Sequence, residues 1–150
     1  MAQDHATAVR RREVLVSITM KRVASAPHHQ LLIAEADDIL IVVPDEGFKD
    51  TPEASRVTVA ALRDYAQKLG KKCGLVIVMN NLLAQEPESR RVYADGVTPD
   101  LFYGIVMVVT SPLARAMGRI STRLATLKVP LVLTDSIEAG IAWSEANRQA

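Results

Sequence analysis

The chain has 150 residues, of which 49% are hydrophobic and 23% charged, and its 18 basic and 17 acidic residues give a formal net charge of +1. This length and composition fit one soluble globular domain with a sizeable core. The balanced charge argues against a nucleic-acid binder, because neutralising phosphates needs a basic surface. Aromatic residues make up only 4%, so we expect an aliphatic core.

A single cysteine, Cys73, excludes an internal disulfide and suits a reducing compartment. The longest apolar runs are about seven residues, well short of the roughly 20 that cross a bilayer. The basic run Arg10–Arg12 precedes an alternating segment rather than the apolar core of a signal peptide. We therefore expect a cytoplasmic protein without a membrane span.

Residues 1–12 are polar and without periodicity, which predicts a flexible arm. A single domain is expected over residues 13–150. Apolar and polar residues alternate from Val14 to Met20, which predicts a half-buried strand. Residues 24–30 predict a loop. Its adjacent histidines have no carboxylate or cysteine at ligand spacing, so we expect no metal site there.

Residues 31–35 and 38–43 are short apolar runs separated by Ala36 and Asp37, which predicts a β-hairpin. The second run is apolar throughout, which is typical of a central strand covered on both faces.

A first helix is predicted from Thr51-Pro52-Glu53, with a capping threonine, a first-position proline and an acid in the first turn. Gly70 is expected to end it. Its solvent side is expected to carry Arg56, Arg63 and Gln67. Its buried face is expected to carry the apolar residues at helical spacing: Ala54, Val57, Ala61, Tyr65 and Leu69.

The central stretch, residues 72–95, predicts a buried strand over Leu75–Met79, a short loop after Asn80 and Asn81, and a helix opened by Pro87 with Glu86 as its cap. In α/β sheets, ligand or partner sites lie at such junctions between the carboxyl end of a strand and the N-terminus of the following helix.

The C-terminal third predicts a buried strand over 104–110, a helix beginning at Ser111-Pro112, a short strand over 130–134 and a last helix capped by Asp135. One flank of the Ser111 helix repeats arginine, which predicts either a solvated face or a docking surface for an acidic partner; these residues are Arg115, Arg119 and Arg123. The whole pattern predicts an α/β domain with a mixed, mainly parallel sheet of about five strands, an N-terminal antiparallel hairpin and about four helices.

No catalytic motif is present. The strand-to-helix junctions contain no phosphate-binding glycine loop, no nucleophile elbow occurs, and all three histidines lie before residue 30. Acids near the helix starts suit the helix dipole, with a paired acid–base site as the alternative interpretation; they are Asp45, Glu46, Asp50, Glu86 and Glu88. We expect no enzyme, no catalytic residue, no cofactor and no metal.

Four segments resemble the STAS family of anti-sigma-factor antagonists, and more closely a bacterial branch of STAS-like (SpoIIAA-like) domains. They are LVIVMNNL at 75–82, the helix residues 88–94, VMVVTSPLARAMGR at 106–119 and DSIEAGIAW at 135–143. The resemblance covers residues 31–148 and implies a single STAS-like domain with a regulatory role and no catalysis.

In that family a serine at the start of the helix after this strand is phosphorylated by a partner kinase, and Ser89 is the matching position. A phosphate on Ser89 would gain from the helix dipole and from Arg90 or Arg91. The alternative is that Ser89 is an ordinary residue of the first turn.

Two functional hypotheses follow. The first is a protein-binding module, regulated at Ser89, that uses residues 80–91 toward an anti-sigma factor or a serine-kinase-like regulator, with a homodimer also compatible. Its partner-binding candidates are Asn80, Asn81, Glu88, Arg90, Arg91, Ser111 and Arg115. Mass spectrometry that never shows a modified Ser89, together with pull-downs that return no partner, would remove its mechanism.

The second hypothesis is a domain that binds a small ligand, with lipids and nucleotides as candidate classes, or a small enzyme. It would use the cleft between the strand ends at Asn80 and Thr110. A pocket with convergent polar groups would favour this hypothesis, and a filled, flat surface would count against it.

Overall fold

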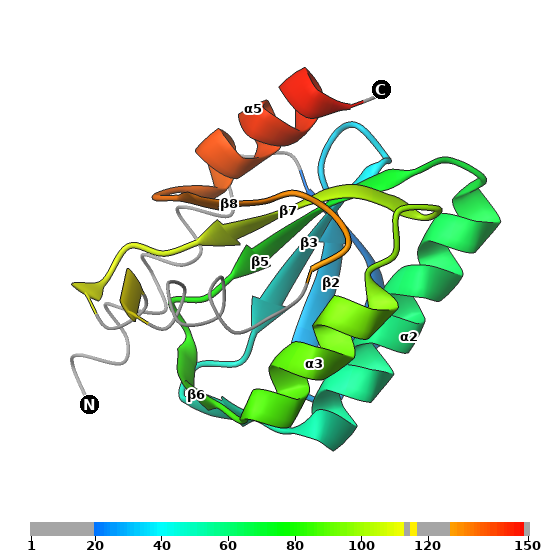
Figure 1. Ribbon diagram of the computed structural model, residues 1–150. Helices are drawn as coiled ribbons and strands as arrows, with labels where there is room; N and C mark the ends of the chain where they lie inside the picture. The colour runs from blue at the N-terminus through cyan, green and yellow to red at the C-terminus, as the bar shows by residue number, and fades with distance from the viewer. Residues whose placement is uncertain (1–19, 113–114, 117–126, 149–150) are drawn as a thin grey trace.

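A six-stranded sheet organises the chain in the computed structural model, which describes residues 20–112, 115–116 and 127–148 (Figure 1). Its strand order is β1-β2-β3-β5-β7-β8. The strands are β1 (Lys21–Ala26), β2 (His29–Ile33), β3 (Ile39–Pro44), β5 (Cys73–Val78), β7 (Phe102–Val108) and β8 (Leu131–Thr134).

The sheet is mixed. Strands β1, β2 and β3 pair antiparallel, whereas β3, β5, β7 and β8 pair parallel. This confirms the predicted α/β class and the antiparallel N-terminal hairpin, but β1 rather than that hairpin forms the edge of the sheet. Parallel neighbours require crossover connections, and helices α2 (Pro52–Leu69) and α3 (Pro87–Gly96) supply two of them.

The strand count differs from the prediction of about five strands. Besides the six-stranded sheet, β4 (Phe48–Asp50) and β6 (Leu82–Gln85) form a separate parallel pair where loops were expected. Strand β1 and the start of β2 occupy most of the loop predicted for residues 24–30. Such short segments carry little periodicity, and their strand geometry depends on pairing with distant neighbours. The strand predicted for residues 14–20 lies outside the described residues except for Met20.

Three helices occur in the described part of the chain, α2, α3 and α5 (Ile137–Asn147), rather than about four. The helix predicted to begin at Ser111 lies largely outside the residues that the structure describes. Helices α2 and α3 cover one face of the sheet and α5 covers the other (Figure 1). Within the described residues, no helix is both long enough and apolar enough to cross a bilayer.

The core is aliphatic and lies on both faces of the sheet. Every residue of β5 is buried, and its side chains alternate between the faces, as strand geometry requires. Leu75 and Ile77 join the cluster under α2 and α3, whereas Val76 and Val78 join the cluster under α5.

Helix α2 begins and ends as predicted, but its most deeply buried residues are not the predicted ones. Thr51 Oγ1 accepts a hydrogen bond from the Ala54 N–H at 3.3 Å, and Gly70 adopts a left-handed φ of 73°. Of the predicted apolar face, Ala61, Tyr65 and Leu69 pack partly buried against the core, but Val57 is 48% exposed. The buried residues of the helix are Ser55, Thr58, Val59, Leu62 and Ala66.

Two smaller expectations also need correction. Arg63, expected on the solvent side, is half-buried and donates to the Gly96 carbonyl and to Thr98 Oγ1 at 2.8 and 2.9 Å. Ser136, rather than Asp135, caps α5, because its hydroxyl accepts from the Ala139 N–H at 3.1 Å.

Candidate functional site

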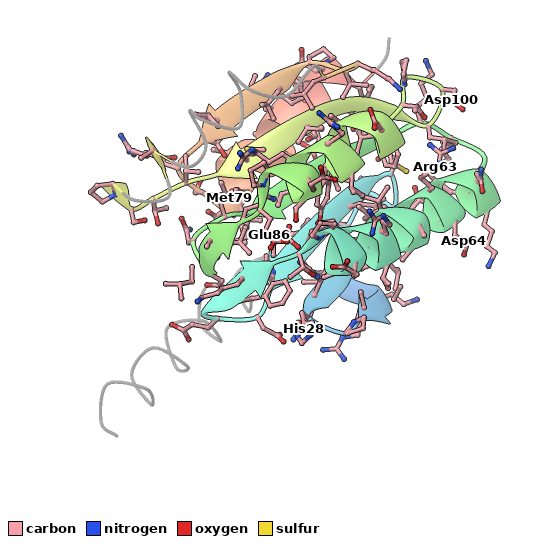
Figure 2. All side chains as sticks on the ribbon, turned by 60° about the horizontal axis from the view of Figure 1, so that its bottom comes forward. His28, Arg63, Asp64, Met79, Glu86 and Asp100 are labelled. Carbon is pink, nitrogen blue, oxygen red and sulfur yellow. The ribbon has the colours of Figure 1, made fainter. Side chains whose placement is uncertain are left out.

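A narrow cavity of about 30 Å³ lies between α3 and the carboxyl ends of β3, β5 and β7. Figure 2 labels Met79 and Glu86 near this end of the sheet, with Asp64 and Asp100 toward the opposite end. Apolar side chains form most of the wall, and a few polar side chains converge on it. The lining residues are His29, Pro44, Asp50, Ile77, Met79, Leu82, Gln85, Arg90, Tyr93, Ile105, Met107 and Leu127.

His29 is the first residue of β2 and lies opposite Pro44 at the end of β3. It is 4% exposed, and its Nδ1 lies 3.0 Å from the Thr58 hydroxyl on α2. Desolvation by burial lowers the pKa of His29, although the carboxylates of Asp50 and Asp45 oppose this shift. The imidazole is therefore neutral near pH 7.

Asp50 ends β4 and is 2% exposed. The Ser55 hydroxyl donates to it, 3.0 Å from each carboxylate oxygen, and Gln85 Nε2 donates to Oδ2 at 3.0 Å. These bonds compensate for burying the carboxylate. Because Asp50 is bonded to Ser55 and Gln85 rather than to the imidazole, His29 and Asp50 do not form the hydrogen-bonded relay of a catalytic triad.

Helix α3 supplies Arg90 and Tyr93. Arg90 is half-buried, and its Nη1 donates to the Gln85 carbonyl at 3.3 Å. Tyr93 is 8% exposed, and burial raises the pKa of its phenol, with the charge of Asp50 adding to the effect. The site therefore combines a cation, a neutral imidazole, a neutral phenol and the hydrogen-bonded carboxylate of Asp50 with an apolar wall.

The two predicted partner-binding asparagines hold the backbone together. Asn80 Oδ1 accepts from the Thr110 N–H at 2.8 Å, so the predicted cleft between these strand ends is bridged. Asn81 Nδ2 donates to the Pro44 carbonyl at 2.8 Å, and its own carbonyl accepts from the Gly47 N–H. The cavity lies closer to the sheet than predicted, beside Met79 and Met107.

Ser89 is completely buried, and its hydroxyl has no hydrogen-bond partner within the described residues. Its position in the first turn of α3 is as predicted. A kinase needs an accessible hydroxyl, so this burial argues against phosphorylation of Ser89 in the folded domain. The sequence places Ser89 in the first turn, but packing decides which way that turn faces.

The other candidates lie apart from the cavity lining, except for Arg90. Glu88, Arg91 and Arg115 are exposed, and Ser111 is half-buried. Arg119 and Arg123 lie outside the described residues. No group of His, Cys, Asp and Glu side chains in the described ranges could hold a metal ion.

Sequence reasoning missed His29, Asp50, Gln85 and Tyr93 as members of one site. The sequence pattern predicts a loop at His29 and favours a helix-dipole role for Asp50. A usable signal was present: Asp50 precedes a helix whose inward positions, Ser55 and Thr58, carry hydroxyl groups. Polar residues on a buried face need partners, and Asp50 and His29 are those partners.

Comparison of the chain with family models, curated proteins and solved structures gave no match. The resemblance to STAS-like domains therefore stays a prediction.

Proposed function

We propose that this domain binds a small molecule at the carboxyl ends of β3, β5 and β7, without catalysing a reaction on it. The observation that carries the proposal is the cavity where buried polar groups meet an apolar wall. Ligand sites in α/β sheets favour this position, and a few convergent polar groups in a mainly apolar hollow are typical of them. A water molecule needs roughly 10–15 Å³ in such a cavity. The hollow therefore admits only a small group, and the rest of a larger ligand would lie at its mouth.

The hydrogen bonds around the cavity favour binding over catalysis. Thr58 occupies one nitrogen of His29, and Ser55 and Gln85 occupy the carboxylate of Asp50. A general base must lie within hydrogen-bond reach of the proton that it removes, and a third group commonly orients the base. The described hydrogen bonds instead hold the polar groups in fixed positions, which suits recognition.

Binding to a protein partner through residues 80–91 stays a prediction. The feature that could serve it is Leu83, a large apolar side chain that is 54% exposed. Single exposed leucines are normal on soluble proteins, so Leu83 gives no specific support.

A cavity-filling variant tests the proposed function. Met107 lines the cavity from β7 and is partly buried, and phenylalanine in its place adds roughly three heavy atoms that would occupy the space. We expect a set of short aliphatic acids, amides and alcohols to contain binders of the wild-type chain, detected by ligand-observed NMR. A binder at about 100 times its Kd should stabilise the fold by about 2.7 kcal/mol, seen as a rise in Tm.

Met107→Phe is expected to abolish this binding while its circular dichroism remains that of the wild type. Leu133→Phe, which adds the same ring to a 37% exposed position on β8, should bind as the wild type does. If none of these probes binds the wild type, or if Met107→Phe binds them equally well, the proposed function is wrong.

A further inference from the structure

Arg90 brings a positive charge to the cavity without a carboxylate to pair with it. Its one hydrogen bond within the described residues goes from Nη1 to the Gln85 carbonyl, and that bond is long at 3.3 Å. No ion pair of the described residues includes Arg90. An arginine offers five N–H donors in a planar fork, so most of its donors remain for another group.

The neighbouring acids do not serve as its partner. Asp50 lines the same cavity, but its oxygens accept from Ser55 and Gln85. Glu86 and Glu88 flank the start of α3, and both are exposed. Glu86 also makes no side-chain cap, so the positive end of the helix dipole adds to the charge of Arg90.

The size and the walls of the cavity restrict what could pair with Arg90. At roughly 10–15 Å³ per water molecule, about 30 Å³ admits a group of two or three heavy atoms. A carboxylate has this size, whereas a phosphate is larger. The side chains of Ile77, Leu82 and Ile105 line the hollow, and excluding water there strengthens an ionic hydrogen bond.

We infer that the ligand of this cavity is a small organic carboxylate, with its carboxylate paired to the guanidinium of Arg90. The inference rests on the proposed function and narrows it to one chemical class. An arginine binds a carboxylate through two parallel N–H···O bonds, and His29 is among the polar residues that line the same hollow. The hydrocarbon part of the ligand would lie at the mouth of the cavity, outside the space that the carboxylate fills.

A matched acid and amide test this inference on the wild-type chain. Butyrate and butyramide have nearly the same shape and differ in charge, and titration calorimetry measures the Kd of each. We expect butyrate to bind at least roughly tenfold more tightly than butyramide, because hydrogen bonds to charged groups are the stronger ones. Inorganic phosphate is expected not to compete with butyrate.

Two adjacent arginines provide the variant and its control. Arg90→Gln should weaken butyrate binding by roughly ten- to hundredfold and leave butyramide binding unchanged. Arg91→Gln removes the same charge one residue along the helix, at an exposed position outside the cavity, and should bind butyrate as the wild type does. The acid–amide comparison on the wild type decides the question even if Arg90→Gln does not fold.

The outcomes separate this inference from the proposed function. Equal affinity for butyrate and butyramide, or unchanged butyrate binding by Arg90→Gln, overturns the carboxylate inference. If binding of the amide is then lost in Met107→Phe, the proposed function stands with a neutral ligand. If no short acid, amide or alcohol binds the wild type, both are overturned.

Discussion

His29 and Thr58 meet in the interior of the protein although they are 29 residues apart in the chain. Their contact joins the first residue of β2 to the inner face of α2, beside the cavity. The contact holds Nδ1 of the buried imidazole against the Thr58 hydroxyl. The residue is therefore both part of the fold and part of the candidate site.

Protonation of His29 should make stability depend on pH. In the folded chain, burial lowers the pKa of His29 below its ordinary value of 6.5. His28 adds slightly to that shift, whereas Asp50 and Asp45 oppose it. The folded state then binds the proton less readily than the unfolded state. The resulting stabilisation is complete above pH 6.5, the ordinary histidine pKa, and is lost as the pH falls through the lowered pKa of the folded chain.

We predict that the wild-type free energy of unfolding decreases between about pH 7.5 and about pH 5.5, measured by urea denaturation. His29→Gln, which cannot take up the proton, should show a flatter dependence over this range. His28→Gln changes the adjacent, exposed histidine and should keep the wild-type dependence. Equal slopes for wild type and His29→Gln would show that His29 is not the responsible group.

At the scale of elements, α2 and α3 pack closely where α3 ends. A Cβ atom on Gly96 would lie 2.3 Å from Cγ1 of Val59, so the helices approach to a distance that glycine alone permits. This packing orients the whole of α3, including Arg90 at the cavity.

We predict that Gly96→Ala destabilises the fold by about 1–3 kcal/mol through overpacking, although alanine is the better helix former by about 1 kcal/mol. Val59→Ala removes the clashing methyl group, so in that background Gly96→Ala should cost much less. The coupling is measured by a double-mutant cycle from urea denaturation. Asp95→Ala, at an exposed position beside Gly96, serves as the control and should change stability by less than about 0.5 kcal/mol. Additive effects of Gly96→Ala and Val59→Ala would contradict the predicted clash.

At the scale of the whole molecule, one ion pair joins segments 110 residues apart. Arg148, at the end of α5, donates to both oxygens of Asp38 at 2.6 and 2.7 Å. Asp38 lies in the turn between β2 and β3, is 5% exposed, and accepts the Gly74 N–H through its carbonyl. The pair holds the C-terminal helix to the amino-terminal end of β3, and the carboxylate of Asp38 raises the pKa of Arg148.

We predict that Arg148→Ala lowers the free energy of unfolding by about 2 kcal/mol, because Asp38 is left buried without its charge partner. The loss stays below that of a fully buried pair, since the Arg148 side chain is 44% exposed. Lys71→Ala removes the solvent-exposed pair with Asp37 and should cost about 0.5 kcal/mol or less. Similar losses in the two variants, measured by urea denaturation, would argue against a special role for the Arg148–Asp38 pair.

The local pattern of the sequence was sufficient for much of the architecture. The helix boundaries at Thr51 and Gly70, the buried strand predicted over Leu75–Met79 and the helix opened by Pro87 all depend on residues close together in the chain. Caps, proline positions and apolar periodicity act locally, so a single sequence reports them directly. The antiparallel pairing of β2 with β3 followed from two short apolar runs in the same way.

Only the tertiary structure decided which polar residues turn inward. Ser55 and Thr58 belong to the buried face of α2 because Asp50 and His29 reach them from β4 and β2, and Ser89 is buried by packing rather than by its own chemistry. Hydrogen bonds between distant segments determine these orientations, and no local periodicity encodes them. For the same physical reason the cavity beside Arg90 was absent from the sequence-based prediction, since it arises where several separate elements meet.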